Sequence, residues 1–365
     1  MSKRFVCAAV IGGLLMVCGI ALAFCALHIS DYDLTAIDME KWEMNDHVIT
    51  DAFTSISVDT DTADVKIFPS EDGACRVVCH ERKKLVHSVA VENGTLKISL
   101  VDNRKWYEHI SFFSFGEEQI GIYLPKAEYE SLYIKNSTGA VSVPDSFSFG
   151  EIDISLSTGN VICNASAKGQ IKIKATTGKI SVEGISAKDI SLRCSTGNIG
   201  ASGVSCVGTV TVQVSTGKAT LTDVSCAELV STGNTGDITL KNVVATGKLV
   251  VTRTTGDIRF DRCDASSVQV KTDTGDVSGS FASSKIFSAR SDTGKINVPA
   301  STEGGLCEIE TDTGDIKIEI KKSIKNEHRN KKSPMLVRST LLSLFLYLPY
   351  PFRSRRDHPL WTRER

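Results

Sequence analysis

The chain has 365 residues, and 41% of them are hydrophobic, which is enough for a sizeable core. Its formal net charge of -1 is unevenly distributed. Residues 321–365 contain 12 Lys/Arg against 3 Asp/Glu, a charge of +9, which leaves -10 for residues 1–320. An acidic body argues against nucleic acid as a partner.

The first segment is typical of a membrane anchor. Lys3 and Arg4 precede an uncharged, mostly apolar run over residues 5–29, which as a helix would span about 37 Å against roughly 30 Å of hydrocarbon. The basic flank predicts a cytoplasmic N-terminus and a single-pass protein of the cell membrane, with its body on the extracytoplasmic side. Two alternatives stay open: a signal peptide cleaved after Ala21–Ala23, and a lipoprotein modified at Cys25.

Residues 131–320 contain a repeat of 19 or 20 residues. A Thr-Gly pair recurs in register ten times, at Gly139, Gly159, Gly178, Gly197, Gly217, Gly236, Gly256, Gly275, Gly294 and Gly314. In nearly every repeat, apolar residues stand seven and five positions before the glycine, and two and four positions after it. This alternation predicts two short strands per repeat, each with one buried face, joined at the Thr-Gly corner.

One repeat is too small to bury its own apolar face, so the repeats must stack. Stacked parallel strands lie about 4.8 Å apart and bond to each other through their backbones. The sequence therefore predicts an all-β protein, a single-stranded parallel β-solenoid of about ten coils, preceded by one transmembrane helix. Glycine suits the corner because tight turns often need positive φ. The threonines would form a column able to hydrogen-bond along the stack. A further apolar position, seven residues after some glycines, leaves two-sided and three-sided coils both open.

Residues 31–130 fit the repeat poorly. A degenerate coil is predicted around Ala63, and Asn93-Gly94 between two alternating runs predicts a hairpin. Trp106–Phe115 is rich in aromatic residues, which would either pack on the first coils or contact a partner. The predicted organisation is an anchor over 1–30, an irregular β cap with one degenerate coil and a hairpin insertion over 31–130, coils over 131–320, and a basic, disordered tail over 321–365.

The stretch Ile122–Pro125, followed by Leu132–Ile134 and the run of S-T-G-N, T-T-G-K, T-T-G-D and D-T-G-D turns, resembles the bacterial putative-adhesin family of β-solenoid proteins. The similarity covers about residues 50–320. It implies the solenoid architecture and a binding role, and it carries no catalytic residues onto this chain. Residues 321–365 depart from the family pattern.

Few residues suggest chemistry. None of the seven histidines falls between residues 131 and 320, so a Ser-His-Asp or Cys-His site on the repeats would need a distant segment. No P-loop or dinucleotide fingerprint is present. The cysteines match no zinc signature, and most of those outside the anchor stand at apolar positions of the repeat, which predicts buried small hydrophobic residues.

The corner carboxylates are the candidate binding surface. Asp257, Asp276 and Asp315 each follow a corner glycine directly. Two of them on adjacent coils would lie about 5 Å apart, a spacing that a retaining glycosidase could use. Other repeats place Lys or Asn there, so a solvated corner is the simpler interpretation. The corner carboxylates could also bind calcium, with ligands drawn from a larger set, Asp273, Asp276, Asp292 and Asp312.

The sequence thus favours a membrane-anchored, extracytoplasmic binding or scaffold module over an enzyme, because long repetitive surfaces suit extended partners. Such a partner would be a cell-surface protein or a polysaccharide, and not nucleic acid. One alternative is a sensor or regulator of envelope state that acts through residues 5–29. A second alternative is a carbohydrate-active β-helix enzyme.

Overall fold

The computed structural model describes residues 3–29, 42–104 and 117–321. The predictions for Trp106–Phe115 and for the tail beyond residue 321 lie outside these residues. The helix α1 covers Lys3–Ile29. Among the described residues, no helix combines the length and the apolar character needed to cross a membrane. The transmembrane role of residues 5–29 stays a prediction.

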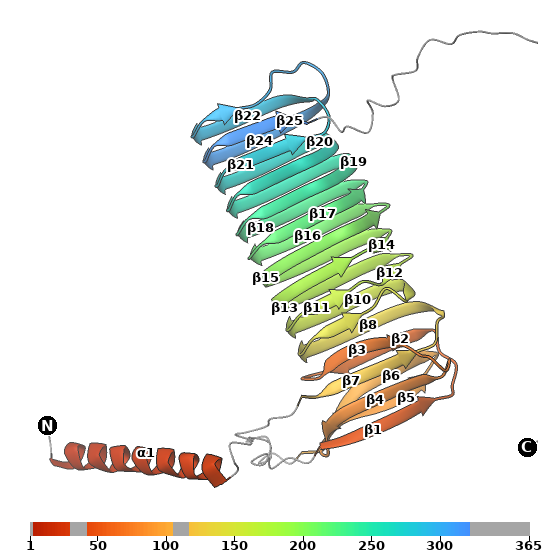
Figure 1. Cartoon of the computed structure of the whole chain (residues 1–365), viewed down its shortest axis with the longest axis vertical. Helices are drawn as coiled ribbons and strands as arrows, with labels where there is room; N and C mark the ends of the chain where they lie inside the picture. Colours follow the sequence, from red (N-terminus) through yellow and green to blue (C-terminus); the bar gives the residue numbers. More distant parts are fainter. Residues whose placement is uncertain (1–2, 30–41, 105–116, 322–365) are drawn as a thin grey trace, which may run out of the picture. The chain divides into compact units, whose positions relative to one another are not determined.

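All other regular elements of the described residues are strands. In chain order they are β1 Trp42–Ile49, β2 Ser55–Thr60, β3 Asp64–Pro69, β4 Cys75–Arg82, β5 Leu85–Glu92, β6 Thr95–Asp102, β7 Gln119–Leu124, β8 Glu128–Thr138, β9 Val141–Val143, β10 Ser148–Thr158, β11 Val161–Cys163, β12 Ser166–Ala167, β13 Gln170–Glu183, β14 Ser186–Ala187, β15 Asp189–Cys206, β16 Thr209–Thr216, β17 Ala219–Cys226, β18 Glu228–Thr235, β19 Ile238–Thr255, β20 Ile258–Thr274, β21 Val277–Phe281, β22 Lys285–Thr293, β23 Ile296–Asn297, β24 Gly305–Thr313 and β25 Ile316–Ile320. From β8 onward they stack as parallel coils (Figure 1). The predicted all-β parallel solenoid of about ten coils is therefore present.

Each coil has three inward-facing stretches. In the coil of Gly178, the side chains of Ile171 and Ile173 are buried before the glycine, and those of Ile180 and Val182 after it. The chain then bends at Gly184, where φ is 65°, and Ile185 and Ala187 continue the core. This second bend recurs one coil apart in a column of left-handed residues, Gly184, Gly203, Asp223, Asn242 and Arg262. The coils are three-sided, an alternative that the sequence had left open.

The Thr-Gly corner brings two backbones into close approach. Gly256 has φ of 143°, a conformation that residues with a side chain rarely adopt. A Cβ at this position would also lie 2.6 Å from the carbonyl carbon of Gly236 in the preceding coil. On the other side of the corner, the N–H of Gly256 donates to the carbonyl oxygen of Thr274 in the next coil, at 2.8 Å. Glycine is therefore required here for its φ angle and for the lack of a side chain.

The coils do not all stack in chain order. At the N-terminal end, β6 and β7 pair with β2 and β3 and form an extra coil beneath them, while β8 and β9 pair on the other side. At the C-terminal end, β24 lies between β20 and β22, because Ile309 is in register with both Val270 and Ala289. The coil of Gly314 is thus inserted between the coils of Gly275 and Gly294. The repeat period alone gives no sign of either exchange.

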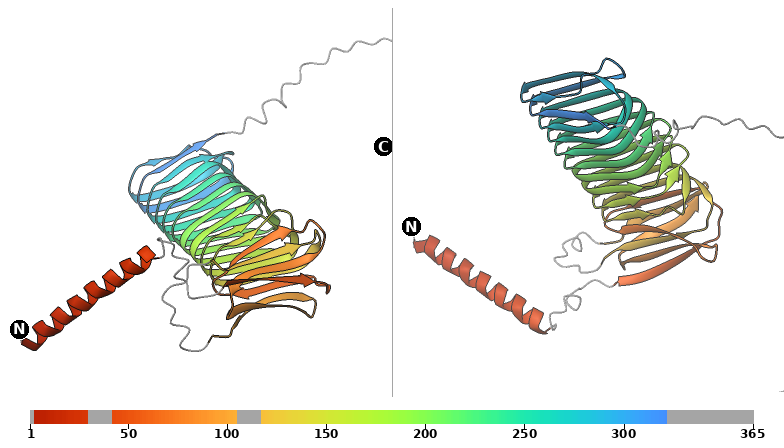
Figure 2. Two further views of the ribbon diagram at one scale, coloured as in Figure 1. Left: turned by 60° about the horizontal axis from the view of Figure 1, so that its bottom comes forward. Right: turned by 45° about the horizontal axis from the view of Figure 1, so that its top comes forward.

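Antiparallel strands cover the N-terminal end of the stack (Figure 2). β5 pairs with β6 through the turn at Asn93-Gly94, with φ of 51° and 72°, β4 pairs with β7, and β1 pairs with β4. At the opposite end, β22 and β23 pair only with β24 and β25 among the described strands. The inward-facing Ile296 is 46% exposed there. The two ends therefore differ in how far their core is covered.

The interior is apolar and contains free thiols. All eight cysteines between Cys75 and Cys307 are buried, and none of them forms a disulfide. Burial raises the pKa of their thiols, for example that of Cys163 to about 12. Their interpretation as small hydrophobic core residues is confirmed.

Replacing Gly256 with valine should lower the free energy of unfolding by more than about 1 kcal/mol, because a β-branched residue resists positive φ and its Cβ would overlap the preceding coil. Gly200→Val is the matched control, since Gly200 lies in β15 with no atom within 4 Å of an added Cβ. Thermal and urea unfolding measure both variants. Equal stability of the two would show that the corner does not demand glycine.

Candidate functional site

The three predicted corner carboxylates lie in one column. The backbone N–H of Asp276 donates to Oδ1 of Asp257 at 3.1 Å, and the N–H of Asp315 donates to Oδ1 of Asp276 at 2.8 Å. Asp237 extends the column in one direction, accepting from the N–H of Asp257 at 3.2 Å. Lys295 extends it in the other, donating its N–H to Oδ1 of Asp315 at 2.7 Å. Asp276 and Asp315 are neighbours because the coil exchange places the coil of Gly314 on that of Gly275.

Asparagine plays the same part in the earlier coils. Oδ1 of Asn160 accepts from the N–H of Lys179 at 3.0 Å, and Oδ1 of Asn198 accepts from the N–H of Lys218 at 2.9 Å. Among the residues that the structure describes, no hydrogen bond joins one corner threonine hydroxyl to the next. The ladder expected of the threonines is made instead by the Asp and Asn residues that follow the glycines.

The charges of this column are only partly compensated. The side chain of Asp237 bonds Lys218, and that hydrogen bond, with one from the N–H of Asp257, lowers the pKa of the Asp237 carboxyl. Asp257 pairs with Arg259 at 2.8 Å. Asp276 and Asp315 are exposed, and neither has a lysine or arginine partner among the described residues. They form an acidic corner whose second oxygens face solvent.

The four carboxylates considered for calcium do not assemble into a site. Among the described residues, the only group of three or more Cys, His, Asp or Glu side chains close enough to share an ion lies in the N-terminal cap. Asp292 instead contacts Arg290, at 3.1 Å. The corner therefore gives no support to a calcium site.

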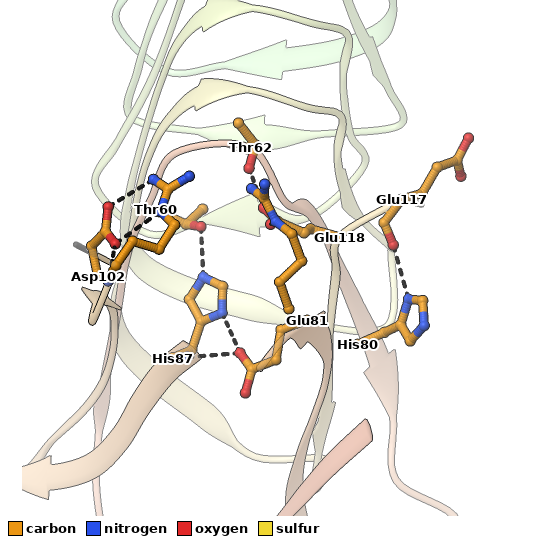
Figure 3. Close-up of polar contacts among 10 residues, drawn as sticks. Thr60, Thr62, His80, Glu81, His87, Asp102, Glu117 and Glu118 are labelled. Carbon is orange, nitrogen blue, oxygen red and sulfur yellow. Dashed lines mark hydrogen bonds and ion pairs between the residues drawn. The ribbon is translucent and has the colours of Figure 1, made fainter. Parts of the chain in front are cut away.

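A buried polar cluster in the cap was not predicted from the sequence (Figure 3). His87 in β5 is 4% exposed and Glu81 in β4 is 1% exposed. Nδ1 of His87 lies 2.7 Å from Oε2 of Glu81, and the backbone N–H of His87 donates to the same oxygen at 2.7 Å. Nε2 of His87 lies 2.8 Å from Oγ1 of Thr60 at the end of β2. Asn45 in β1 donates from Nδ2 to Oε1 of Glu81 at 2.7 Å. The cluster thus connects four strands.

A second buried carboxylate lies beside the first. Glu118 accepts a hydrogen bond from Nε of Arg82 at 2.6 Å and another from the hydroxyl of Thr62. This carboxylate has a permanent cation as its partner. Glu81 has no lysine or arginine partner among the described residues, and the nearest group able to carry positive charge is the imidazole of His87.

The order Thr60, His87, Glu81 is that of a hydroxyl, an imidazole and a carboxylate in a hydrolase triad. All three side chains are buried, however, and the hydroxyl faces the interior of the first coil. A substrate would have to enter the core to reach it. We therefore interpret the triad-like order as a network that fastens the cap to the coils.

Sequence reasoning missed this cluster because its members belong to four strands and form no motif. One signal was available: Thr60 occupies the inward position that Leu156 and Ala175 fill in other coils. A buried polar residue needs a hydrogen-bond partner, and for Thr60 that partner comes from the cap.

The same inward position holds a buried arginine in a later coil. Arg253 is 2% exposed and bonds the carbonyl oxygen of Thr252 and the hydroxyl of Ser231. Burial lowers the pKa of its guanidinium to about 10. Gly233 occupies the equivalent inward position in the preceding coil. A Cβ at Gly233 would lie 2.8 Å from Nη1 of Arg253, so the glycine leaves room for the guanidinium. A glycine at an inward position that other coils fill with a side chain was the sequence signal for this buried arginine.

The chain matches the family model described as Toastrack DUF4097 twice, over residues 53–217 and 205–333. The chain belongs to this family. The matched residues of this Toastrack chain include the corner column and Thr60, Glu81 and His87, whereas Asn45 precedes them. No curated protein matches the chain.

Several solved structures resemble it at low identity. A "putative adhesin" from Bacteroides fragilis is 16% identical over 76% of this chain and 97% of its own, with a TM-score of 0.39. A "putative lipid binding protein" from Parabacteroides distasonis is 18% identical over 66% and 94%, with a TM-score of 0.37. A "putative adhesin" from Parabacteroides merdae is 15% identical over 66% and 97%, with a TM-score of 0.30.

The ladder predicts a difference between two substitutions of one residue. Asp276→Ala should lower the free energy of unfolding by about 0.5–1.5 kcal/mol, because the N–H of Asp315 loses its acceptor. Asp276→Asn should be nearly neutral, since Asn160 and Asn198 accept the same bond elsewhere. Urea unfolding of both variants provides the measurement. An alanine variant as stable as the asparagine variant would contradict the structural role of the ladder.

Proposed function

We propose that this Toastrack chain is a binding or scaffold module of the cell envelope, which contacts an extended partner through several adjacent coils. The partner is a cell-surface protein or a polysaccharide. One observation carries the proposal: Asp276 and Asp315 present exposed carboxylates one coil apart, without a basic partner among the described residues. Charges left unpaired on a rigid scaffold are available to an incoming ligand.

The geometry of the stack supports a surface of this kind. Equivalent side chains recur at the strand spacing of about 4.8 Å, so that a partner with its own repeat can make the same contact several times. Each single contact is weak at an exposed site, and linked contacts add through their effective concentration. Binding of this type should decline in steps as corners are changed.

The proposal includes a location outside the cytoplasm. It is supported by the apolar run of residues 5–29, by the basic residues before it and by the acidic residues after it. Cell fractionation and protease treatment of intact cells test it. We expect the full-length chain in the membrane fraction, with the solenoid open to external protease. A chain found in the soluble cytoplasmic fraction would contradict this location.

The binding role is tested by changing Asp257, Asp276 and Asp315 together to Asn. The amide keeps the acceptor of the ladder and removes the charge, so folding should persist while binding weakens. The measurement is adhesion to, or pull-down from, envelope fractions by the purified full-length chain and by its variants. Single and double variants should give intermediate binding.

The same experiment separates the alternatives. Turnover of a polysaccharide that vanishes with one Asp substitution would replace the binding module with a carbohydrate-active enzyme. If no envelope fraction binds the chain, the sensor becomes the better hypothesis. It would then be examined by exchanging residues 5–29 for an unrelated anchor.

A further inference from the structure

We propose that Cys79, Glu81 and His87 form a zinc site inside the N-terminal cap. The three residues come from two neighbouring strands, β4 and β5, and all are buried. Their ligand atoms, Sγ of Cys79, a carboxylate oxygen of Glu81 and a ring nitrogen of His87, lie within 4.8 Å of one another. Thiolate, imidazole and carboxylate are the ligands that zinc takes in proteins.

The distances are compatible with one ion after a small adjustment. Zinc binds nitrogen and oxygen at about 2.0–2.2 Å and sulfur at about 2.3 Å, which places tetrahedral ligand atoms roughly 3.4 Å apart. Nδ1 of His87 and Oε2 of Glu81 are closer than this, at 2.7 Å. Side-chain rotations that move each ligand atom by less than about 1 Å would therefore separate Nδ1 and Oε2 enough for one ion to lie between them.

The charge of the cluster calls for a cation. Glu81 is a carboxylate removed from water, and burying an unpaired charge is costly. Its neighbour Glu118 meets this cost through Arg82. For Glu81 the described residues offer hydrogen bonds from Asn45 and His87, and the imidazole of His87 is the one neighbouring group that can carry a positive charge. A bound divalent ion would supply for Glu81 the positive charge that Arg82 supplies for Glu118.

The residues around the three ligands hold them in place. Thr60 contacts Nε2 of His87, which leaves Nδ1 directed to the cluster, and Asn45 fixes Oε1 of Glu81, which leaves Oε2 directed to it. A second hydrogen bond on the far side of each ligand is usual in metal sites. These outer contacts come from β1 and β2, so an ion at this place would hold the cap strands to the first coil.

Cys79 differs from the other buried cysteines in its surroundings. On the inward face of β4 it follows Cys75 and Val77 and precedes Glu81, where the face changes from apolar to polar. Burial, with the nearby charge of Glu81, raises the pKa of the Cys79 thiol to about 12. Cys75 shares the strand and the burial but not the cluster, and so is the matched control.

The test uses the full-length chain, purified in detergent and freed of metal, with Cys7, Cys18 and Cys25 replaced by Ala. Titration with Co²⁺ should produce the absorption band of a thiolate bound to cobalt, at one ion per chain, and Zn²⁺ should displace it. Cys79→Ala should abolish the band and His87→Ala should weaken metal binding at least about 10-fold. Cys75→Ala should retain both. A folded chain without the band, or a band that survives Cys79→Ala, would overturn the proposal.

A second measurement covers variants that fail to fold. Zn²⁺ should raise the melting temperature of the unsubstituted chain and of Cys75→Ala, because a ligand of the native state stabilises it. No zinc-dependent shift in the unsubstituted chain would overturn the site. This outcome is independent of whether the solenoid binds an envelope partner.

Discussion

The close approach of backbones at the Thr-Gly corner is the constraint on which the stack depends. At Gly197 and at Gly256, the carbonyl group of the glycine one coil earlier fills the space of a side chain. Because each corner glycine lies against the glycine of the preceding coil, a slip of one residue would bring a threonine, an asparagine or an aspartate into that space. The slip would also turn the apolar residues of every strand outward. The glycines therefore fix the register, and the register buries the core.

The same corner explains the choice of the residue that follows the glycine. Its N–H points along the stack, and a side-chain oxygen of Asp or Asn in the adjacent coil accepts it, as Asp276 does for Asp315. Both residue types satisfy the backbone, but only Asp adds charge. The structural requirement thus leaves the electrostatics of this edge free to vary. The later coils use that freedom to carry Asp257, Asp276 and Asp315, whereas the earlier ones carry Asn160 and Asn198.

Much of this fold follows from the sequence because the repeat is local. The ten Thr-Gly corners, the alternation on either side and the hairpin at Asn93-Gly94 depend on residues close together in the chain. The stacking order at the ends depends on which coil edges remain unpaired, and no local pattern encodes it. The third side of the coil was ambiguous since its bend is made by Gly184 in one coil and by Arg262 in another. A left-handed φ is uncommon for arginine, so the residue type at position 262 does not predict the bend.

The same distinction between local patterns and contacts of distant segments separates the two candidate sites. The corner carboxylates were found because they share a position in the repeat. Their hydrogen bonds to backbone N–H groups of the adjacent coil were missed because those bonds form only between coils. The cap cluster has no repeat to reveal it, and its members meet only when β4 and β5 fold over the exposed end of the stack. Covering a parallel sheet edge requires strands that differ from the repeat. The cap is therefore the part of this solenoid in which single residues can be specialised without being copied along the stack, and Cys79, Glu81 and His87 lie there.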